Sequence, residues 1–209
     1  MKNVFVLSLV FLCLTVGIAL GDEVTLTPTA DSPVFGYNPG TNYGGQSYGY
    51  WGYYNAPMRT LVKYNLTSVV GTVTAVKLSF QLQQNNWSGT TIWACKLQGD
   101  WAEMTVTYAN QPAHDTSAAG IFLTATAPSG LGPFTLDCTA AAVTIVQSWI
   151  STPATNYGII LRTETEGSSL RAYPYMRESS SQPVRLVVTY TPGSAIAPAS
   201  LGRVKTLFR

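Results

Sequence analysis

Two pairs of carboxylates have the residue types and the short spacing that could do chemistry in this chain. They are Asp100 with Glu103, and Glu164 with Glu166. Glycoside hydrolysis uses two such groups, one as acid and one as base or nucleophile. The first pair belongs to a dense motif around Trp101 and is expected to bond backbone amides. The second pair follows an expected strand and is interpreted as a solvated rim, so neither pair predicts a catalytic site.

A single histidine, His114, stands beside Asp115. Neighbouring residues on a loop rarely face one another as the members of a hydrolase triad do, and His114 is expected to be solvated. The chain has no Gly-x-Ser-x-Gly or His-Glu-x-x-His motif. We therefore expect no enzyme, no catalytic residue, no metal and no cofactor. Calcium is an alternative through Asp31 or Asp137 with backbone carbonyls, but no clustered acidic loop supports it.

Aromatic rings offer binding chemistry instead. Residues 37–55 form a long run rich in Gly, Tyr and Asn. Aromatic faces are apolar while the polar groups of Tyr and Trp remain available for hydrogen bonds, which suits the mixed surface of a sugar. The candidate platforms are Tyr50, Trp51, Tyr53, Tyr54 and Trp87. The alternative is that these rings pack in the core or within the loop.

Five cations are the second set of candidate ligand-binding residues. Each lies opposite the main apolar face of its expected strand, so the five line one outer surface if the strands share a sheet. Guanidinium and ammonium groups there would bind the carboxylates of uronate sugars, although ordinary solubilising charge is the alternative. The five residues are Arg59, Lys63, Lys77, Arg162 and Arg185.

The elements that position these residues are expected to be β-strands. In 73–83, Val76, Leu78, Phe80 and Leu82 alternate with polar residues, which indicates a strand buried on one face. Similar runs cover 90–97, 121–126, 134–138, 157–163 and 183–190. Many short strands at this spacing predict an all-β fold, an antiparallel β-sandwich like a jelly roll.

One segment, 139–150, has helical periodicity instead. Val143, Val146 and Ile150 share a helical face and Thr139 can cap the first turn. We predict one short helix that closes one end of the sandwich.

The two ends of the chain differ in composition from the middle. Residues 1–21 read as a secretory signal peptide: Lys2 precedes an apolar run, and small residues precede Asp22. A transmembrane anchor is the alternative. Residues 22–191 are expected to form one β-sandwich domain. Residues 192–209 read as a linker followed by a basic amphipathic tail, which either contacts the cell envelope or is a disordered end. The sequence thus predicts a secreted, extracellular or cell-surface protein.

Two cysteines, Cys95 and Cys138, remain after the predicted signal peptide. Two cysteines in a secreted protein favour one disulfide, and we assign both to the inward rows of their strands. The alternative is two buried free thiols. The formal charge of the whole chain is +2, and it includes cations of the signal peptide and the tail. Without these the domain is slightly acidic, which argues against nucleic acid as a partner.

Several short motifs occur in an order that is similar to a known family. The densest is Trp101–Pro112, which contains no catalytic device and whose polar side chains look suited to bracing a loop. The others are Ala30-Asp31 with Asn42-Tyr43-Gly44, Arg59–Leu66, Asp137-Cys138-Thr139, Asn156-Tyr157-Gly158 and Arg185–Tyr190. With these motifs, nearly all of residues 24–191 resembles the DNRLRE domain, also classed as carbohydrate-binding module family 96.

The resemblance implies a secreted or cell-surface β-sandwich that binds carbohydrate without catalysis. Characterised members of this class bind alginate, so it implies an acidic polysaccharide as partner, in agreement with the five cations. Cys138 departs from the aliphatic residue more usual there, and the tyrosine-rich loop is richer in aromatics than expected. The alternative function is a structural or adhesive protein of the cell surface or extracellular matrix.

Overall fold

The computed structural model describes residues 21–86, 89–167 and 170–193. Three predictions fall on residues outside these ranges: residues 1–20 of the predicted signal peptide 1–21, residues 194–209 of the predicted linker and tail 192–209, and the candidate platform Trp87.

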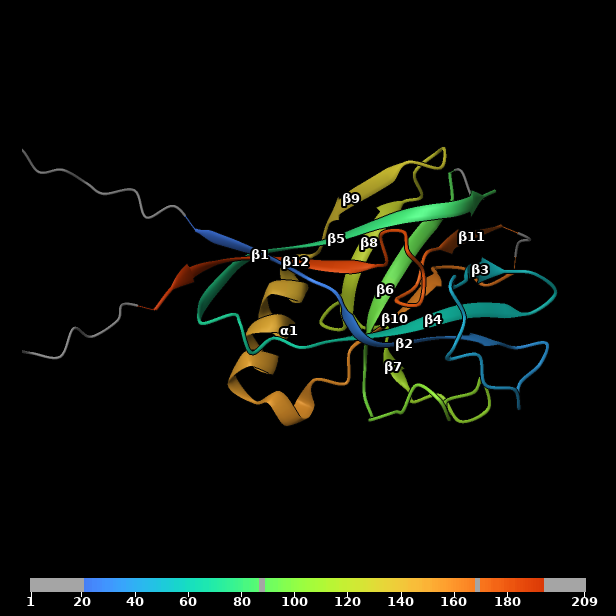
Figure 1. Ribbon diagram of the computed structural model, residues 1–209, viewed down its shortest axis with the longest axis horizontal. Coiled ribbons are helices and arrows are strands. Elements are labelled where there is room, and N and C mark those ends of the chain that lie inside the picture. The colour runs from blue at the N-terminus through green and yellow to red at the C-terminus, as the bar shows by residue number, and fades with distance from the viewer. Residues whose placement is uncertain (1–20, 87–88, 168–169, 194–209) are drawn as a thin grey trace, which may run out of the picture.

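The described chain is built of strands with one α-helix and one short 3₁₀ helix (Figure 1). The strands are β1 (Asp22–Leu26), β2 (Pro28–Phe35), β3 (Trp51–Tyr53), β4 (Pro57–Tyr64), β5 (Gly71–Asn85), β6 (Thr91–Leu97), β7 (His114–Asp115), β8 (Ile121–Thr126), β9 (Pro133–Asp137), β10 (Ile159–Thr163), β11 (Arg171–Pro174) and β12 (Arg185–Pro192). The helices are α1 (Ala140–Ser151) and the 3₁₀ helix η1 (Pro153–Thr155).

The strands form two antiparallel layers that share β5. The first half of β5 pairs with β12 and β9, and β12 also pairs with β1. Its last residues pair with β11, which leads through β3 and β4 to β10, β6 and β7, while β2 and β8 pair with β4 and β6. The all-β antiparallel sandwich predicted from the alternating runs is therefore confirmed.

The main core lies between these layers. Val76, Leu78, Phe80 and Leu82 of β5 are at most 3% exposed, as their alternation predicts. Burying such rows removes apolar surface from water, the dominant favourable contribution to folding.

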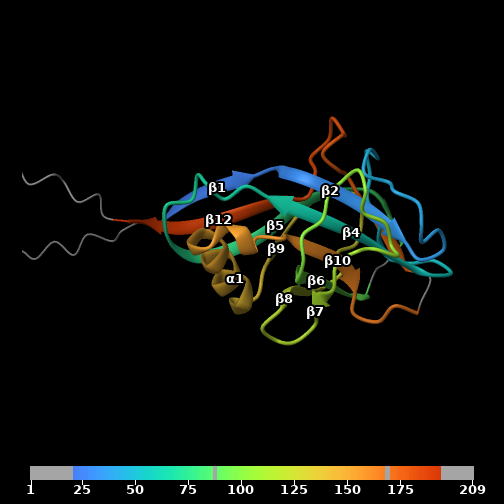
Figure 2. The same cartoon turned by 90° about the horizontal axis from the view of Figure 1, so that it is seen from below.

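Helix α1 covers one end of this core, beside β1 and β12 (Figure 2). Thr139 caps it, because its side chain accepts a hydrogen bond from the amide of Ala142. The predicted helix is confirmed, and its buried residues are Ala142, Ile145, Val146 and Trp149. Of the row expected from the sequence only Val146 is buried, whereas Val143 and Ile150 are partly buried. None of the described helices is long and apolar enough to span a membrane.

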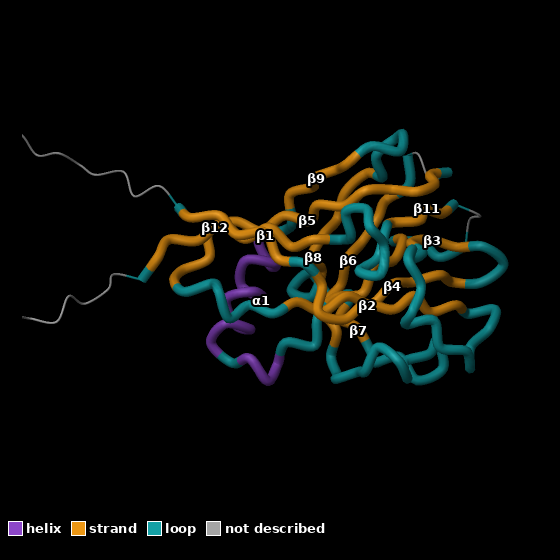
Figure 3. Tube along the Cα trace, in the orientation of Figure 1, coloured by secondary structure: helices purple, strands orange, loops and turns teal. Residues whose placement is uncertain are grey.

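A second, smaller cluster lies on the other face of the β4–β10–β6 layer. Leu61, Ile160 and Leu97 supply strand residues to it, and Trp101 and Val106 cover them from the loop that follows β6. The motif 101–112 forms turns within this loop. Most loops gather at the end of the molecule opposite α1 (Figure 3).

The predicted disulfide is wrong, because Cys95 and Cys138 are both free. Cys95 is fully buried in the second cluster, whereas its neighbour Ala94 faces the main core. Cys138 packs against the main core. Both rows of β6 are buried, so alternation alone assigned Cys95 to the wrong face. The backbone of β6 therefore separates the two sulfurs.

We expect a protein that starts at Asp22 to expose two reactive thiols only after unfolding. Burial raises the pKa of Cys95 to about 11 and raises that of Cys138 further, so little thiolate forms at neutral pH. Titration with Ellman's reagent, without reductant, should be slow in the native state and give two thiols in guanidinium chloride. If no reactive thiol is found after unfolding, the two cysteines form a disulfide after all.

Candidate functional site

The five candidate cations do not lie on one surface. Arg59 and Lys63 are on β4 and Arg162 is on β10, whereas Lys77 and Arg185 are on β5 and β12 of the other layer. The two layers are continuous through β5, but β4 and β10 lie in one layer and β12 in the other, so the five cations do not form one strip.

Arg59 and Arg162 lie beneath the loop that covers the second cluster. The Nε and Nη2 atoms of Arg59 donate to both carboxylate oxygens of Glu166, each at 2.7 Å, and Arg162 lies 3.6 Å from the same carboxylate. The three side chains are only 11–13% exposed. Burial opposes the charge of Arg59, but the bond to Glu166 holds the pKa of Arg59 above its usual value. These cations therefore brace the structure.

His114 belongs to the same network and is not the solvated loop residue expected from the sequence. Its Nε2 lies 2.9 Å from Nη1 of Arg162, and because a guanidinium only donates, this nitrogen accepts the bond. Burial, with the nearby charges of Arg59 and Arg162, lowers the pKa of His114 to about 4. The imidazole is therefore neutral at physiological pH.

The other three cations differ in their surroundings. Lys63 is 2.6 Å from Asp100 and lies 5.2 Å from the ring centroid of Trp101, and Lys77 is 3.8 Å from the exposed Asp137. The Nε of Arg185 is buried without a hydrogen-bond partner. Thus one member of each carboxylate pair of the sequence, Asp100 and Glu166, holds a cation of the protein itself.

Two of the aromatic candidates, Trp51 and Tyr53, differ in position. Trp51 is fully buried in the main core, where its indole donates to the carbonyl of Arg162 at 2.6 Å, so it offers no face to a ligand. Tyr53 is half-buried, with its hydroxyl 3.4 Å from the carbonyl of Asn55.

A cluster of tyrosines that the sequence only partly indicated surrounds β3 and β11. We call it the tyrosine patch and define it by the rings of Tyr37, Tyr43, Tyr48, Tyr50, Tyr54 and Tyr173. The buried ring of Phe35 lies beneath it, stacked on Tyr37 at 5.3 Å and within 4.5 Å of Tyr43 and Tyr50. Tyr37 and Tyr54 are 45% and 46% exposed. The patch is thus held from below and open to solvent at two rings.

Edge contacts order the inner rings of the patch. The ring of Tyr50 meets that of Tyr173 edge-on, with centroids 4.8 Å apart, and lies tilted against that of Tyr48 at 5.6 Å. Burial raises the pKa of Tyr50, and a hydrogen bond with Tyr48 contributes to the same shift. Burial also raises the pKa of Tyr37. The hydroxyls of Tyr37 and Tyr50 therefore remain protonated donors at physiological pH.

Arg171 places a cation within the tyrosine patch. Its guanidinium carbon lies 4.1 Å from the ring centroid of Tyr54, and its Nε donates to the hydroxyl of Tyr173. Gly52 pairs with Arg171 across β3 and β11, and a Cβ there would lie 2.7 Å from the Cα of Arg171. Glycine therefore permits this close approach of the strands. Among the described residues no carboxylate forms an ion pair with Arg171.

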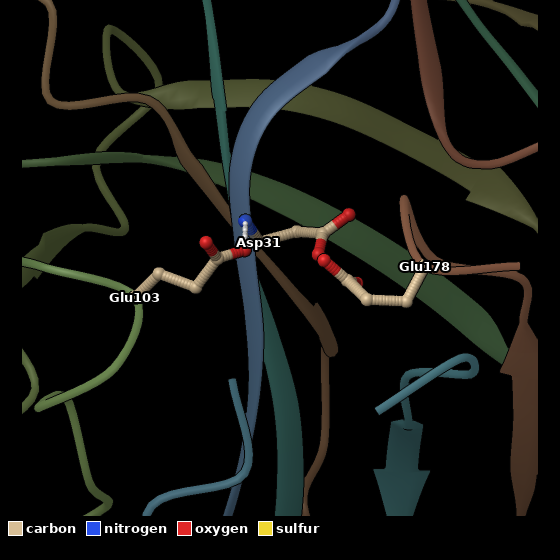
Figure 4. A group of neighbouring side chains, drawn as sticks. All are labelled: Asp31, Glu103 and Glu178. Atoms are coloured by element: carbon tan, nitrogen blue, oxygen red, sulfur yellow. Dashed lines mark hydrogen bonds between the residues drawn. The ribbon is translucent and has the colours of Figure 1, made fainter. Parts of the chain in front are cut away.

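Three carboxylates meet at the free edge of β2, where Asp31 lies between Glu103 and Glu178 (Figure 4). Each offers an oxygen within 4.8 Å of the others, a spacing that could hold a metal ion. Glu103 accepts from the amide of Asp31 at 2.9 Å, and Arg177 contacts Glu103 at 2.6 Å and Glu178 at 3.0 Å. Arg177 thus already supplies one counter-charge. Sequence reasoning saw Asp31 but missed this group, because its members are far apart in the chain.

The comparisons with known proteins agree with the fold. The sequence model of carbohydrate-binding module family 96 matches residues 22–190. A search of the curated proteins finds no match. Because the family match spans nearly all of the described residues, the resemblance noted from the motifs is confirmed, and the chain belongs to carbohydrate-binding module family 96.

Proposed function

We propose that this protein is a secreted, non-catalytic module that binds an acidic polysaccharide through Arg171 and the tyrosine patch. Membership of the family supports a module that binds carbohydrate. An acidic ligand is supported by the guanidinium of Arg171, which lies on an exposed tyrosine and has no acidic partner among the described residues.

The charge pattern favours Arg171 over the cations named from the sequence. Arg59, Arg162 and Lys63 hold carboxylates of the protein itself, two of them beneath a loop. A ligand would have to displace those partners. The two Nη groups of Arg171, in contrast, donate to no described residue, so they are free for a bidentate bond to a uronate carboxylate.

The rings around Arg171 suit the rest of a sugar. Tyr54 and Tyr37 present exposed apolar faces, and the tyrosine hydroxyls supply hydrogen-bond donors beside them. Because these groups come from the 37–55 loop and from β11, a polysaccharide would contact two segments that pairing of β3 with β11 holds together.

We expect Arg171→Ala to weaken retention on alginate about tenfold, since a charge-assisted hydrogen bond would be lost. Affinity electrophoresis in gels with increasing alginate would measure it. Retention of the wild type should also fall with salt, because exposed charges are screened.

Lys77→Ala is the matched control for this experiment. It removes the same charge from an exposed site on the other layer, and we expect retention equal to that of the wild type. Equal retention of Arg171→Ala and wild type would contradict the proposed site, and equal loss in both variants would indicate a non-specific effect of net charge.

A further inference from the structure

A pocket of about 530 Å³ lies at the α1 end of the molecule. Its walls come from the end of β4 and the loop 65–69 that follows it, from α1 and from the residues around η1. The tyrosine patch surrounds β3 and β11, and these strands lie at the opposite end from α1 (Figure 1). The pocket shares no residue with the patch.

Two residues that line this pocket hold buried polar atoms without a partner. They are Oδ1 of Asn156 and Nε1 of Trp149. The amide of Asn156 is oriented by its other atom, because Nδ2 donates to the carbonyl of Tyr64 at 2.9 Å. Buried polar atoms without hydrogen bonds are rare in folded proteins, and each calls for an explanation. Both atoms are buried in the pocket wall, so a sugar hydroxyl has to enter that wall to reach them. An acceptor and a donor together suit hydroxyl groups, which both donate and accept.

The remaining lining is also mixed in character. Leu66, Val69 and Pro153 are apolar, whereas Thr29, Asn65 and Thr67 carry hydroxyl and amide groups. Small-molecule sites have this size range and combine an apolar lining with a few placed polar groups. A sugar ring has apolar C–H faces and a rim of hydroxyls, and so matches both parts of the lining.

We propose that this pocket is a second saccharide site, which holds one or two sugar units. The proposal goes beyond the function proposed above, because it involves neither Arg171 nor any ring of the tyrosine patch. Lys63 at the wall is paired with Asp100, whose side chain is 75% exposed. Because Lys63 already has this partner, the lining does not fix the charge of the bound sugar, and the experiment compares an acidic with a neutral one. With a site at each end, one molecule would bridge two polysaccharide chains.

The indole N–H of Trp149 and the side-chain amide of Asn156 are reporters of this site in ¹H–¹⁵N spectra of the labelled protein. We expect both signals to shift in a saturable way when a mannuronate trisaccharide or neutral mannotriose is added. The trisaccharide that acts at the lower concentration identifies whether the pocket prefers an acidic or a neutral sugar.

Thr67→Trp and Asn156→Ala test the assignment from two directions. Thr67 is exposed at the rim, so a tryptophan there closes the mouth without touching the core, and we expect the shift of the Trp149 signal to be lost. Asn156→Ala removes the unpartnered acceptor and should weaken binding at least tenfold. Thermal unfolding checks that each variant folds. If Asn156→Ala does not fold, Thr67→Trp alone still tests the site.

Arg171→Ala is the control, and it should leave the Trp149 shift unchanged. A Trp149 signal that neither trisaccharide moves, that moves equally in Thr67→Trp, or that is lost in Arg171→Ala overturns the second site. A pocket that responds while Arg171→Ala keeps full retention on alginate overturns only the function proposed for the patch.

Discussion

Asp31→Asn is expected to stabilise the protein at pH 8 relative to wild type by an amount that shrinks toward pH 5. Asp31 is 1% exposed, and this burial, with the nearby charges of Glu178 and Glu103, raises the pKa of Asp31 to about 7, although the amide of Arg177 opposes the shift. One of its oxygens, Oδ1, has no hydrogen-bond partner. The folded state therefore holds this carboxyl protonated at pH values at which the unfolded chain has already ionised.

The sign follows from proton linkage. Between the unfolded pKa of 3.8 and the folded value of about 7, the folded protein binds one more proton than the unfolded chain, so stability falls as pH rises through this window. An asparagine keeps an acceptor for Arg177 and cannot ionise. The difference in unfolding free energy between variant and wild type should change by about 2–3 kcal/mol from pH 5 to pH 8.

Urea unfolding at pH 5, 6, 7 and 8 measures this difference. His114 has the opposite effect, because its lowered pKa costs stability as pH falls from 6.5 toward 4, but it is present in both proteins and cancels. Asp137→Asn, at an exposed carboxylate paired with Lys77, is the matched control and should give a flat difference. A flat result for Asp31→Asn would mean that Asp31 is ionised in the fold. A calcium titration at pH 8 then tests whether a cation compensates its charge.

Glu166→Ala should destabilise the protein by about 3–5 kcal/mol, the range for removal of one partner of a buried ion pair. The change leaves Arg59 and Arg162, 12% and 13% exposed, without their shared carboxylate. Arg59 also donates to Gln111 and lies 5.3 Å from the ring of Tyr108. We therefore expect the loop 98–113 to loosen together with the loss of stability.

Urea unfolding gives the change in free energy, and amide hydrogen exchange in the loop shows whether it opens. Lys77→Ala, which breaks an exposed pair in the other layer, should change stability by no more than about 0.5 kcal/mol. A Glu166→Ala protein as stable as that control would show that the buried network is replaceable, and Arg59 and Arg162 would again be candidates for ligand binding.

The fold was largely predictable because its strongest signals are local. The apolar row of β5 and the Thr139 cap of α1 both lie where the sequence places them. The buried face of α1 was predicted less well, since Ala142 and Trp149 are buried while Val143 and Ile150 are only partly so. On a short helix with apolar residues around much of its circumference, packing against β5 and β8 decides which row turns inward.

The candidate site was less predictable for the same reason. The tyrosines of the 37–55 loop were visible as an aromatic run, but Tyr173 and Arg171 join them only through the pairing of β3 with β11. For Cys95 the sequence predicted the wrong face of β6, because both faces of this strand are buried and alternation cannot distinguish them.

The sequence by itself determined the fold class, the family and the types of residue available for binding. Strand alternation and ordered motifs are local properties of the chain, and each can be read without knowledge of the neighbours in space. Only the tertiary structure decided which cations are engaged and which are free. The carboxylate that holds Arg59 is Glu166, far away in sequence, and Arg171 is left without one among the described residues. The period of a strand tells which side chains share a face, but not which loop or charge will cover that face.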